Sequence, residues 1–89
     1  MTKVLAKNID RFVETEIDEE TVVMDLESGS FFSLRESARA IWLLIDGTRS
    51  RDAILAALAA EYEAPEAELA IDLDGFIATL REAGLITGG

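Results

Sequence analysis

Hydrophobic and polar residues alternate along the first third of the chain, with a period of two that is typical of half-buried β-strands. The clearest alternation places Val22, Met24 and Leu26 on one face of a strand and Val23 with two acids on the other. Turn signals separate the strands, so the pattern predicts a three-stranded antiparallel meander whose short last strand lies at an edge. The predicted strands are residues 8–17, 21–27 and 30–34, with turns at 18–20 and 28–29.

After these strands the apolar spacing changes to three and four residues, which is typical of amphipathic helices. Ser33 and Glu36 fit a capping box that opens a first helix, and Gly47 ends this helix in the left-handed conformation. Ser50 is the predicted cap of a second helix, and Pro65 suits the first turn of a third. The final forty residues predict helix without any strand. The predicted apolar stripes are Leu34, Ala38, Ile41, Trp42 and Ile45; Ile54, Leu55, Leu58 and Tyr62; and Leu69, Leu73, Phe76, Leu80 and Ala83, with Ile77 beside the last stripe.

Three strands followed by three helices indicate one α+β domain over residues 1–89, with a winged helix-turn-helix-like arrangement. The composition argues against an enzyme. The absence of Cys and His excludes disulfides, thiolate nucleophiles, Cys/His zinc sites and imidazole bases. The serines therefore have no His to activate them, and no glycine-rich phosphate loop is present. No cofactor is expected. No metal site is expected either, because the acids at 18–20 and the pair Asp72/Asp74 lack the spacing of a calcium loop.

The charge of the chain disfavours nucleic acid as a partner. Eighteen acids against eight bases give a net charge of −10, and the bases are scattered. A phosphate backbone repels such a surface unless a local basic patch exists. The sequence also contains no signal-peptide pattern and no run of about 20 apolar residues, so we expect a soluble cytoplasmic protein without a membrane segment.

The chain ends in Gly88-Gly89, a pair that sulfur carriers and protein modifiers use for activation. Such proteins resemble a β-grasp fold, with strands after the helix and a strand before the tail. Because no strand is predicted in the final forty residues, a frayed end is the preferred interpretation.

The adjacent aromatic residues Phe31 and Phe32 lie in the predicted edge strand, where neighbouring side chains point to opposite faces. One ring enters the core, and the other either faces outward or is covered by the third helix. The functional interpretation is that the strand edge and the third helix leave an apolar cleft, to which an extended peptide could add a strand.

Several segments together resemble the PqqD-like proteins, the small recognition elements of ribosomal peptide natural-product pathways. The most specific signal is I-W-x-L-x-D-G followed by a helix cap, supported by an Asp four residues before a Phe and by a closing L-x-x-x-G-L-I. The resemblance extends over residues 8–86. Members commonly have Asn directly after the Leu that ends the third strand, where this chain has Arg35, and the Ser33/Glu36 capping box could replace its function. The matching segments are VVMDLESGSFFSL, SARAIWLLIDGTRSRDAI, LAAEY and DLDGFIATLREAGLI.

The resemblance implies a non-catalytic, winged helix-turn-helix-like module that does not bind DNA. Such proteins bind the leader segment of a precursor peptide and deliver it to a modifying enzyme or leader peptidase. Stand-alone members of this size occur in lasso-peptide and quinone-cofactor pathways. The resemblance places the leader along the third strand and against the third helix.

The peptide-binding residues carried over to this sequence are Ser30, Phe31, Phe32, Ser33 and Leu34 on the strand, and Leu73, Asp74, Ile77 and Arg81 on the helix. Leu69, Phe76 and Leu80 are expected to be mainly core residues, and Arg81 is the expected partner of an acidic leader residue. Changing Phe31 or Ile77 to Asp is therefore expected to weaken binding without unfolding the domain.

Two alternatives remain open at this point. The first is a structural protein–protein adaptor, or a homodimer formed through the exposed sheet edge. The second is a DNA-binding winged helix, which is disfavoured because the segment RSRDAILAALAAEYE is basic only at its start.

Overall fold

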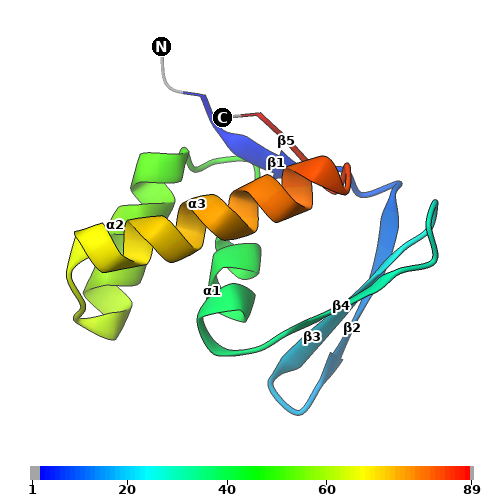
Figure 1. Cartoon of the computed structure of the whole chain (residues 1–89), viewed down its shortest axis with the longest axis horizontal. Coiled ribbons are helices and arrows are strands. Elements are labelled where there is room, and N and C mark those ends of the chain that lie inside the picture. The colour runs from blue at the N-terminus through cyan, green and yellow to red at the C-terminus, as the bar shows by residue number, and fades with distance from the viewer. Residues whose placement is uncertain (1–2, 89) are drawn as a thin grey trace.

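The computed structural model describes residues 3–88. It confirms the expected α+β order of a three-stranded antiparallel meander followed by three helices, and adds a small second sheet (Figure 1). The elements are β1 (Leu5–Lys7), β2 (Phe12–Ile17), β3 (Glu20–Asp25), β4 (Phe31–Leu34), α1 (Glu36–Leu44), α2 (Arg51–Tyr62), α3 (Glu66–Glu82) and β5 (Ile86–Gly88). The strands of the meander lie in the order β2-β3-β4, so β4 is at an edge, as predicted.

The small sheet of β1 and β5 corrects the prediction that the last forty residues contain no strand. Leu5 pairs with Gly88, and its backbone N–H and C=O also bond to Arg49 and Gly47 of the loop before α2. The side chain of Leu5 is completely buried. Gly88 is therefore part of a strand rather than a frayed end, and Gly89 lies outside the described residues.

The alternation in β3 is confirmed, but the face with more apolar residues is the outward one. The buried residues are Thr21, Val23 and Asp25, whereas Val22 and Met24 are half-exposed. Burial of the two polar side chains is tolerated because both are hydrogen-bonded. Hydropathy alone therefore does not identify the buried face of this strand.

Trp42 of α1 joins the helices to the sheet. Its side chain is completely buried, and its ring meets Phe12 of β2 edge-to-face at a centroid distance of 5.1 Å. The indole Nε1 donates to Glu14 at 3.2 Å, and the Nζ atom of Lys7 lies 4.5 Å from the ring centroid. Burial beside the ring lowers the pKa of Lys7, although Glu14 and Asp46 oppose this effect.

The helix ends follow the sequence prediction with one exception. Ser50 caps α2 by accepting from the N–H of Ala53 at 3.2 Å, and Gly47 has the positive φ expected after α1. The predicted capping box is wrong: Arg35 occupies the N-cap of α1 and makes no side-chain cap bond. Ser33 is instead held in β4 opposite Val22, so its hydroxyl is not available to the helix.

The remaining helix predictions hold apart from the orientation of Tyr62, which is exposed. Pro65 is the N-cap of α3, and two acids follow in its first turn. Leu85 and Ile86 fold back into the core, as expected. No helix within residues 3–88 is long and apolar enough to span a membrane.

We expect Leu5→Ala to destabilise the protein by about 2–5 kcal/mol, because it leaves a cavity where β1 meets the core. Ile9→Ala is the matched control, since Ile9 is 75% exposed, and it should change stability by less than about 0.5 kcal/mol. Urea unfolding followed by circular dichroism measures both values. Equal stability of the two variants would show that β1 is not docked.

Candidate functional site

In β4 the backbone N–H and C=O groups of every second residue point away from β3 and have no partner strand. Met24 pairs with Phe31, and one step further the N–H of Asp25 donates to the carbonyl oxygen of Ser30 at 2.8 Å. Hydrogen-bonded pairs alternate with non-bonded pairs in an antiparallel ladder. The β3–β4 bonds therefore use Phe32 and Leu34, and the N–H and C=O groups of Phe31 and Ser33 point to the open edge.

The side chains of β4 divide between the two faces of the sheet. Phe31 is 69% exposed and lies on the outer face, away from the helices. Phe32 is half-buried against the core, and Leu34 is buried. Of the predicted strand residues, Leu34 is therefore a core residue, while Phe31, Phe32 and Ser33 remain accessible to a ligand.

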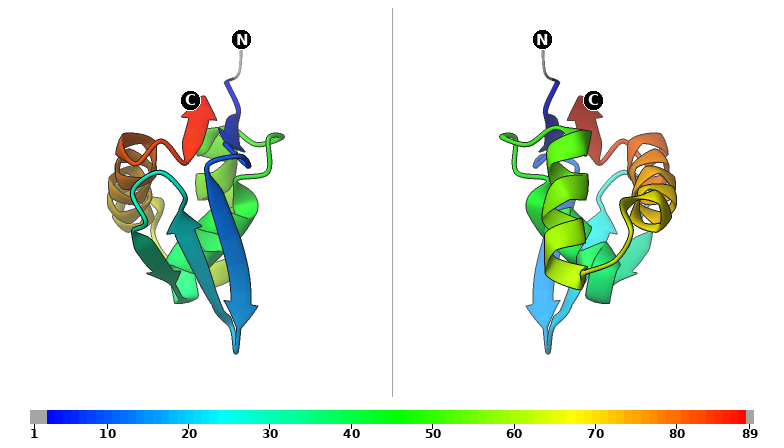
Figure 2. Two further views of the ribbon diagram at one scale, coloured as in Figure 1. Left: turned by 90° about the vertical axis from the view of Figure 1, so that its right-hand side faces the viewer. Right: turned by 90° about the vertical axis from the view of Figure 1, so that its left-hand side faces the viewer.

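The C-terminal end of α3 lies near the start of β4. Leu69, Phe76 and Ala83 are spaced seven residues apart, so they form one line along the helix, and all three are half-buried. The end of this line reaches a hollow of about 330 Å³ at the start of β4. Figure 2 shows β4 as the strand of the meander on the side of α3. The residues lining the hollow are Arg11, Asp25, Glu27, Ser28, Ser30, Phe32, Glu82 and Ala83.

The predicted helix residues lie mostly on another side of α3. Leu73 is completely buried and Ile77 is 5% exposed, so both belong to the core. Asp74, Ile77 and Arg81 line a separate hollow of about 290 Å³ against Leu5, at the start of α2. The structure therefore does not bring these residues together with Phe31 and Phe32. A carboxylate at position 77 would be buried, so Ile77→Asp is expected to unfold the domain.

Asp74 and Arg81 both make contacts within the fold. The Nε and Nη2 atoms of Arg51 each donate to one carboxylate oxygen of Asp74 at 2.8 Å, which ties the start of α2 to α3. This ion pair lowers the pKa of Asp74 and raises that of Arg51. The Nη2 atom of Arg81 donates to the carbonyl oxygen of Gly88 at 2.7 Å.

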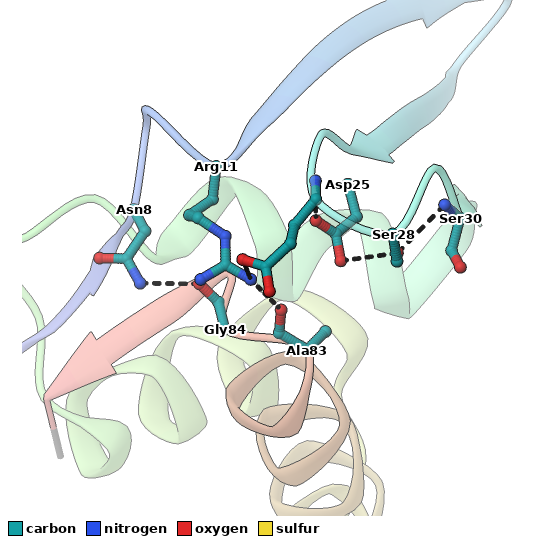
Figure 3. Close-up of polar contacts among 8 residues, drawn as sticks. Asn8, Arg11, Asp25, Ser28, Ser30, Ala83 and Gly84 are labelled. Atoms are coloured by element: carbon teal, nitrogen blue, oxygen red, sulfur yellow. Dashed lines mark hydrogen bonds and ion pairs between the residues drawn. The ribbon is translucent and has the colours of Figure 1, made fainter.

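Asp25 organises the turn that leads into β4 (Figure 3). Its carboxylate accepts from the N–H of Glu27 at 3.0 Å and from the hydroxyl of Ser28 at 2.9 Å. The Ser28 hydroxyl in turn accepts from the N–H of Ser30 at 3.2 Å. The bond from Glu27, followed by that from Ser28, lowers the pKa of Asp25 although only 4% of the residue is exposed.

Two side chains from the β1–β2 connection hold the end of α3 near this turn (Figure 3). The Nδ2 atom of Asn8 donates to the carbonyl oxygen of Gly84 at 2.8 Å, and Arg11 donates to that of Ala83 at 3.2 Å. Arg11 also pairs with Glu27 at 3.0 Å. The guanidinium lies so close to Gly84 that a Cβ atom there would be 2.9 Å from it. These contacts fix the spacing between α3 and the start of β4.

A hollow larger than these two lies elsewhere. It has a volume of about 850 Å³ and lies between the β2–β3 turn, α1 and the end of α2. Its two arginines are engaged in ion pairs, Arg35 with Glu20 at 3.2 Å and Arg39 with Glu16 at 2.7 Å. It does not include the free backbone groups of β4. Within residues 3–88 no group of three or more acids is placed to hold a metal ion.

Comparison with known proteins identifies the family. A family model described as coenzyme PQQ synthesis protein D (PqqD) matches residues 20–86. The chain belongs to the PqqD family. This confirms the resemblance inferred from the sequence, and the match extends from β3 to the start of β5.

One solved structure, "TbiB1 in Complex with the TbiA(beta) Leader Peptide", is similar to this PqqD-family chain. The sequences are 28% identical, the TM-score is 0.80, and the match covers 91% of this chain and 93% of the other. No curated protein matches the chain by sequence.

Sequence reasoning missed the parts of this PqqD-family site that depend on long-range contacts. The Asn8 and Arg11 contacts reach the end of α3 from residues 76 and 72 positions earlier in the chain. The Asp25 contacts, by contrast, stay within the local turn. The line of Leu69, Phe76 and Ala83 was readable from its seven-residue spacing. Arg35, at the position where members commonly have Asn, pairs with Glu20 and does not cap α1.

We expect Asp25→Asn to destabilise the protein at neutral pH and less so in acid. The folded pKa of Asp25 is lowered, so its ionised form contributes stability that is complete above the unfolded pKa of about 3.9. This contribution is lost as the pH falls through the folded pKa. Urea midpoints of wild type and variant, measured between about pH 6 and pH 2, should converge below about pH 4.

The exposed Asp10 provides a matched control for this experiment. Asp10→Asn removes one carboxylate from the same part of the surface without breaking the turn contacts. If the difference in urea midpoint between wild type and Asp25→Asn stayed constant across the pH range, this would contradict the role assigned to Asp25.

Proposed function

We propose that this protein binds the leader segment of a ribosomally made precursor peptide by adding the leader as a strand to β4. The observation that carries the proposal is the open edge at Phe31 and Ser33, with the end of α3 near the start of this strand. Membership of the PqqD family and similarity to a protein solved in complex with a leader peptide support it. Main-chain bonds would give affinity, and side-chain contacts would give specificity.

The added strand would make the meander four-stranded. An antiparallel leader is favoured because antiparallel ladders are slightly more stable and β4 already belongs to one. Its residue opposite Phe32 would point inward and pack between β4 and the flank formed by Leu69, Phe76 and Ala83. The half-exposed apolar surface of that flank is suited to an apolar leader side chain.

The protein would act by presenting the leader to a separate modifying enzyme or leader peptidase. The chain contains no Cys or His, and its serines have no imidazole base to activate them. The binding residues would fix the leader, and the reactions on the precursor would occur in the partner.

We expect Ser33→Pro to weaken binding of the neighbouring precursor peptide at least about tenfold, or about 1.4 kcal/mol, without unfolding the domain. Proline removes the N–H that points to the open edge, while the β3–β4 bonds through Phe32 and Leu34 remain. Isothermal titration against the precursor peptide encoded beside the gene measures the affinity, and a thermal melt checks the fold.

Ser33→Ala keeps the N–H group and should bind like wild type. If the wild-type protein binds none of the short peptides encoded nearby, the proposal is wrong. Light scattering tests the adaptor alternative, which requires a stable dimer that the peptide does not dissociate.

A second pair of variants decides which flank of α3 contacts the leader. We expect Phe76→Ala to lower leader affinity about fivefold or more, because apolar contact area is lost. Arg81→Ala should leave the affinity unchanged, since Arg81 lies by the separate hollow near Leu5. The reverse result would support the flank of Asp74, Ile77 and Arg81 that the sequence predicted.

A further inference from the structure

We propose that the outer face of the sheet holds a second subsite, formed by Phe31 with Met24 beside it, which takes an apolar side chain of the bound leader. This inference rests on the proposed function. It adds that the leader is recognised on both faces of the strand it forms, and not only in the cleft beside α3.

The subsite is the edge end of a row of side chains that crosses the three strands. The register pairs Val13 with Met24 and Met24 with Phe31, so the three lie side by side on one face. Val13 is 49% exposed, Met24 is half-exposed and Phe31 is the most exposed of the three. In the left view of Figure 2 the meander lies in front of α1, and no helix of residues 3–88 covers this outer face.

Strand addition necessarily places a side chain at the end of this row. The free N–H and C=O of Phe31 would bond to the leader residue directly opposite, and directly opposite residues carry their side chains on the same face. The side chain of that leader residue would therefore extend the row as its fourth member. An apolar group there would cover exposed ring surface of Phe31.

The neighbouring row of side chains offers a leader residue a different contact. Thr15 pairs with Val22, and Val22 pairs with Ser33, so this row ends at the edge in a small polar side chain. A leader residue opposite Ser33 would also point outward, but it would find no aromatic surface beside it. The edge therefore distinguishes two outward positions, one that favours an apolar residue and one that tolerates a polar residue.

For an antiparallel leader the structure thus specifies three consecutive residues. The first lies opposite Ser33 and tolerates polar groups, the second lies opposite Phe32 and points toward α3, and the third lies opposite Phe31 and is apolar. Two adjacent apolar residues on opposite faces would be the recognised feature.

Titration of the precursor peptide encoded beside the gene against three Thr variants tests the subsite. We expect Phe31→Thr to weaken binding about fivefold to twentyfold, because Thr keeps strand propensity but loses apolar contact. Val13→Thr should bind nearly like wild type, since Val13 lies three strand spacings, or about 14 Å, from the added strand. Ile71→Thr is the matched control, since Ile71 is 75% exposed on α3, and it should bind like wild type. Phe31→Ile should restore most of the lost affinity.

A double-mutant cycle locates the leader residue. Each residue of the paired leader segment is changed to Thr in turn and titrated against wild type and Phe31→Thr. At one leader position, the change to Thr should weaken binding to wild type but weaken binding to Phe31→Thr little further. The change two residues before it should show no such coupling.

The outcomes separate this inference from the proposed function. If wild type binds, Ser33→Pro weakens binding at least about tenfold, and Phe31→Thr behaves like Ile71→Thr, then strand addition stands and the outer subsite is wrong. If wild type binds no neighbouring precursor peptide, the proposed function fails and the subsite fails with it. Thermal melts of the variants should match wild type, because all three side chains are exposed.

Discussion

The backbone of β4 hydrogen-bonds to β3 through every second residue, and this alternation determines what the free edge can do. Phe32 and Leu34 are used by the ladder, so the groups of Phe31 and Ser33 remain for another strand. The same alternation places Phe31 on the outer face and Phe32 toward α3. The register between β3 and β4 thus determines both which backbone groups are free and which way the side chains point.

This edge is held in place at its start and from the inner face of the sheet. At its start, Asp25 binds the turn that leads into β4, while Asn8 and Arg11 hold the end of α3 near that turn. On the inner face, Trp42 packs against Phe12 and donates to Glu14, which fixes the sheet to α1. A leader would therefore meet a strand and a helix flank whose spacing is already set, which reduces the ordering cost of binding.

Much of the fold was predictable because it depends on local signals. Turn residues, apolar spacing and the cap at Ser50 located the meander and the helices within a few residues. The capping box failed because Ser33 belongs to the β-ladder, and tertiary pairing overrides a local cap. Strand β5 was missed because three residues carry too little pattern without their partner β1.

The site was less predictable, because several faces of α3 are apolar. Steps of four residues selected Leu73 and Ile77, which are core residues, whereas steps of seven select the line of half-buried residues that ends in Ala83 at the hollow beside β4. Sequence spacing identifies side chains that share a line on a helix, but not the element that the line contacts. That assignment required the position of β4 relative to Ala83.

Main-chain pairing alone is too weak to hold a leader on so short a strand. The N–H and C=O groups of Phe31 and Ser33 can make four bonds to an added strand. At about 0.5–1.5 kcal/mol each these contribute about 2–6 kcal/mol, whereas association costs about 4–15 kcal/mol. The difference must come from apolar side-chain contacts. Because Phe32 and the α3 flank offer such contacts on one face and Phe31 on the other, affinity and sequence preference would arise from the same few side chains.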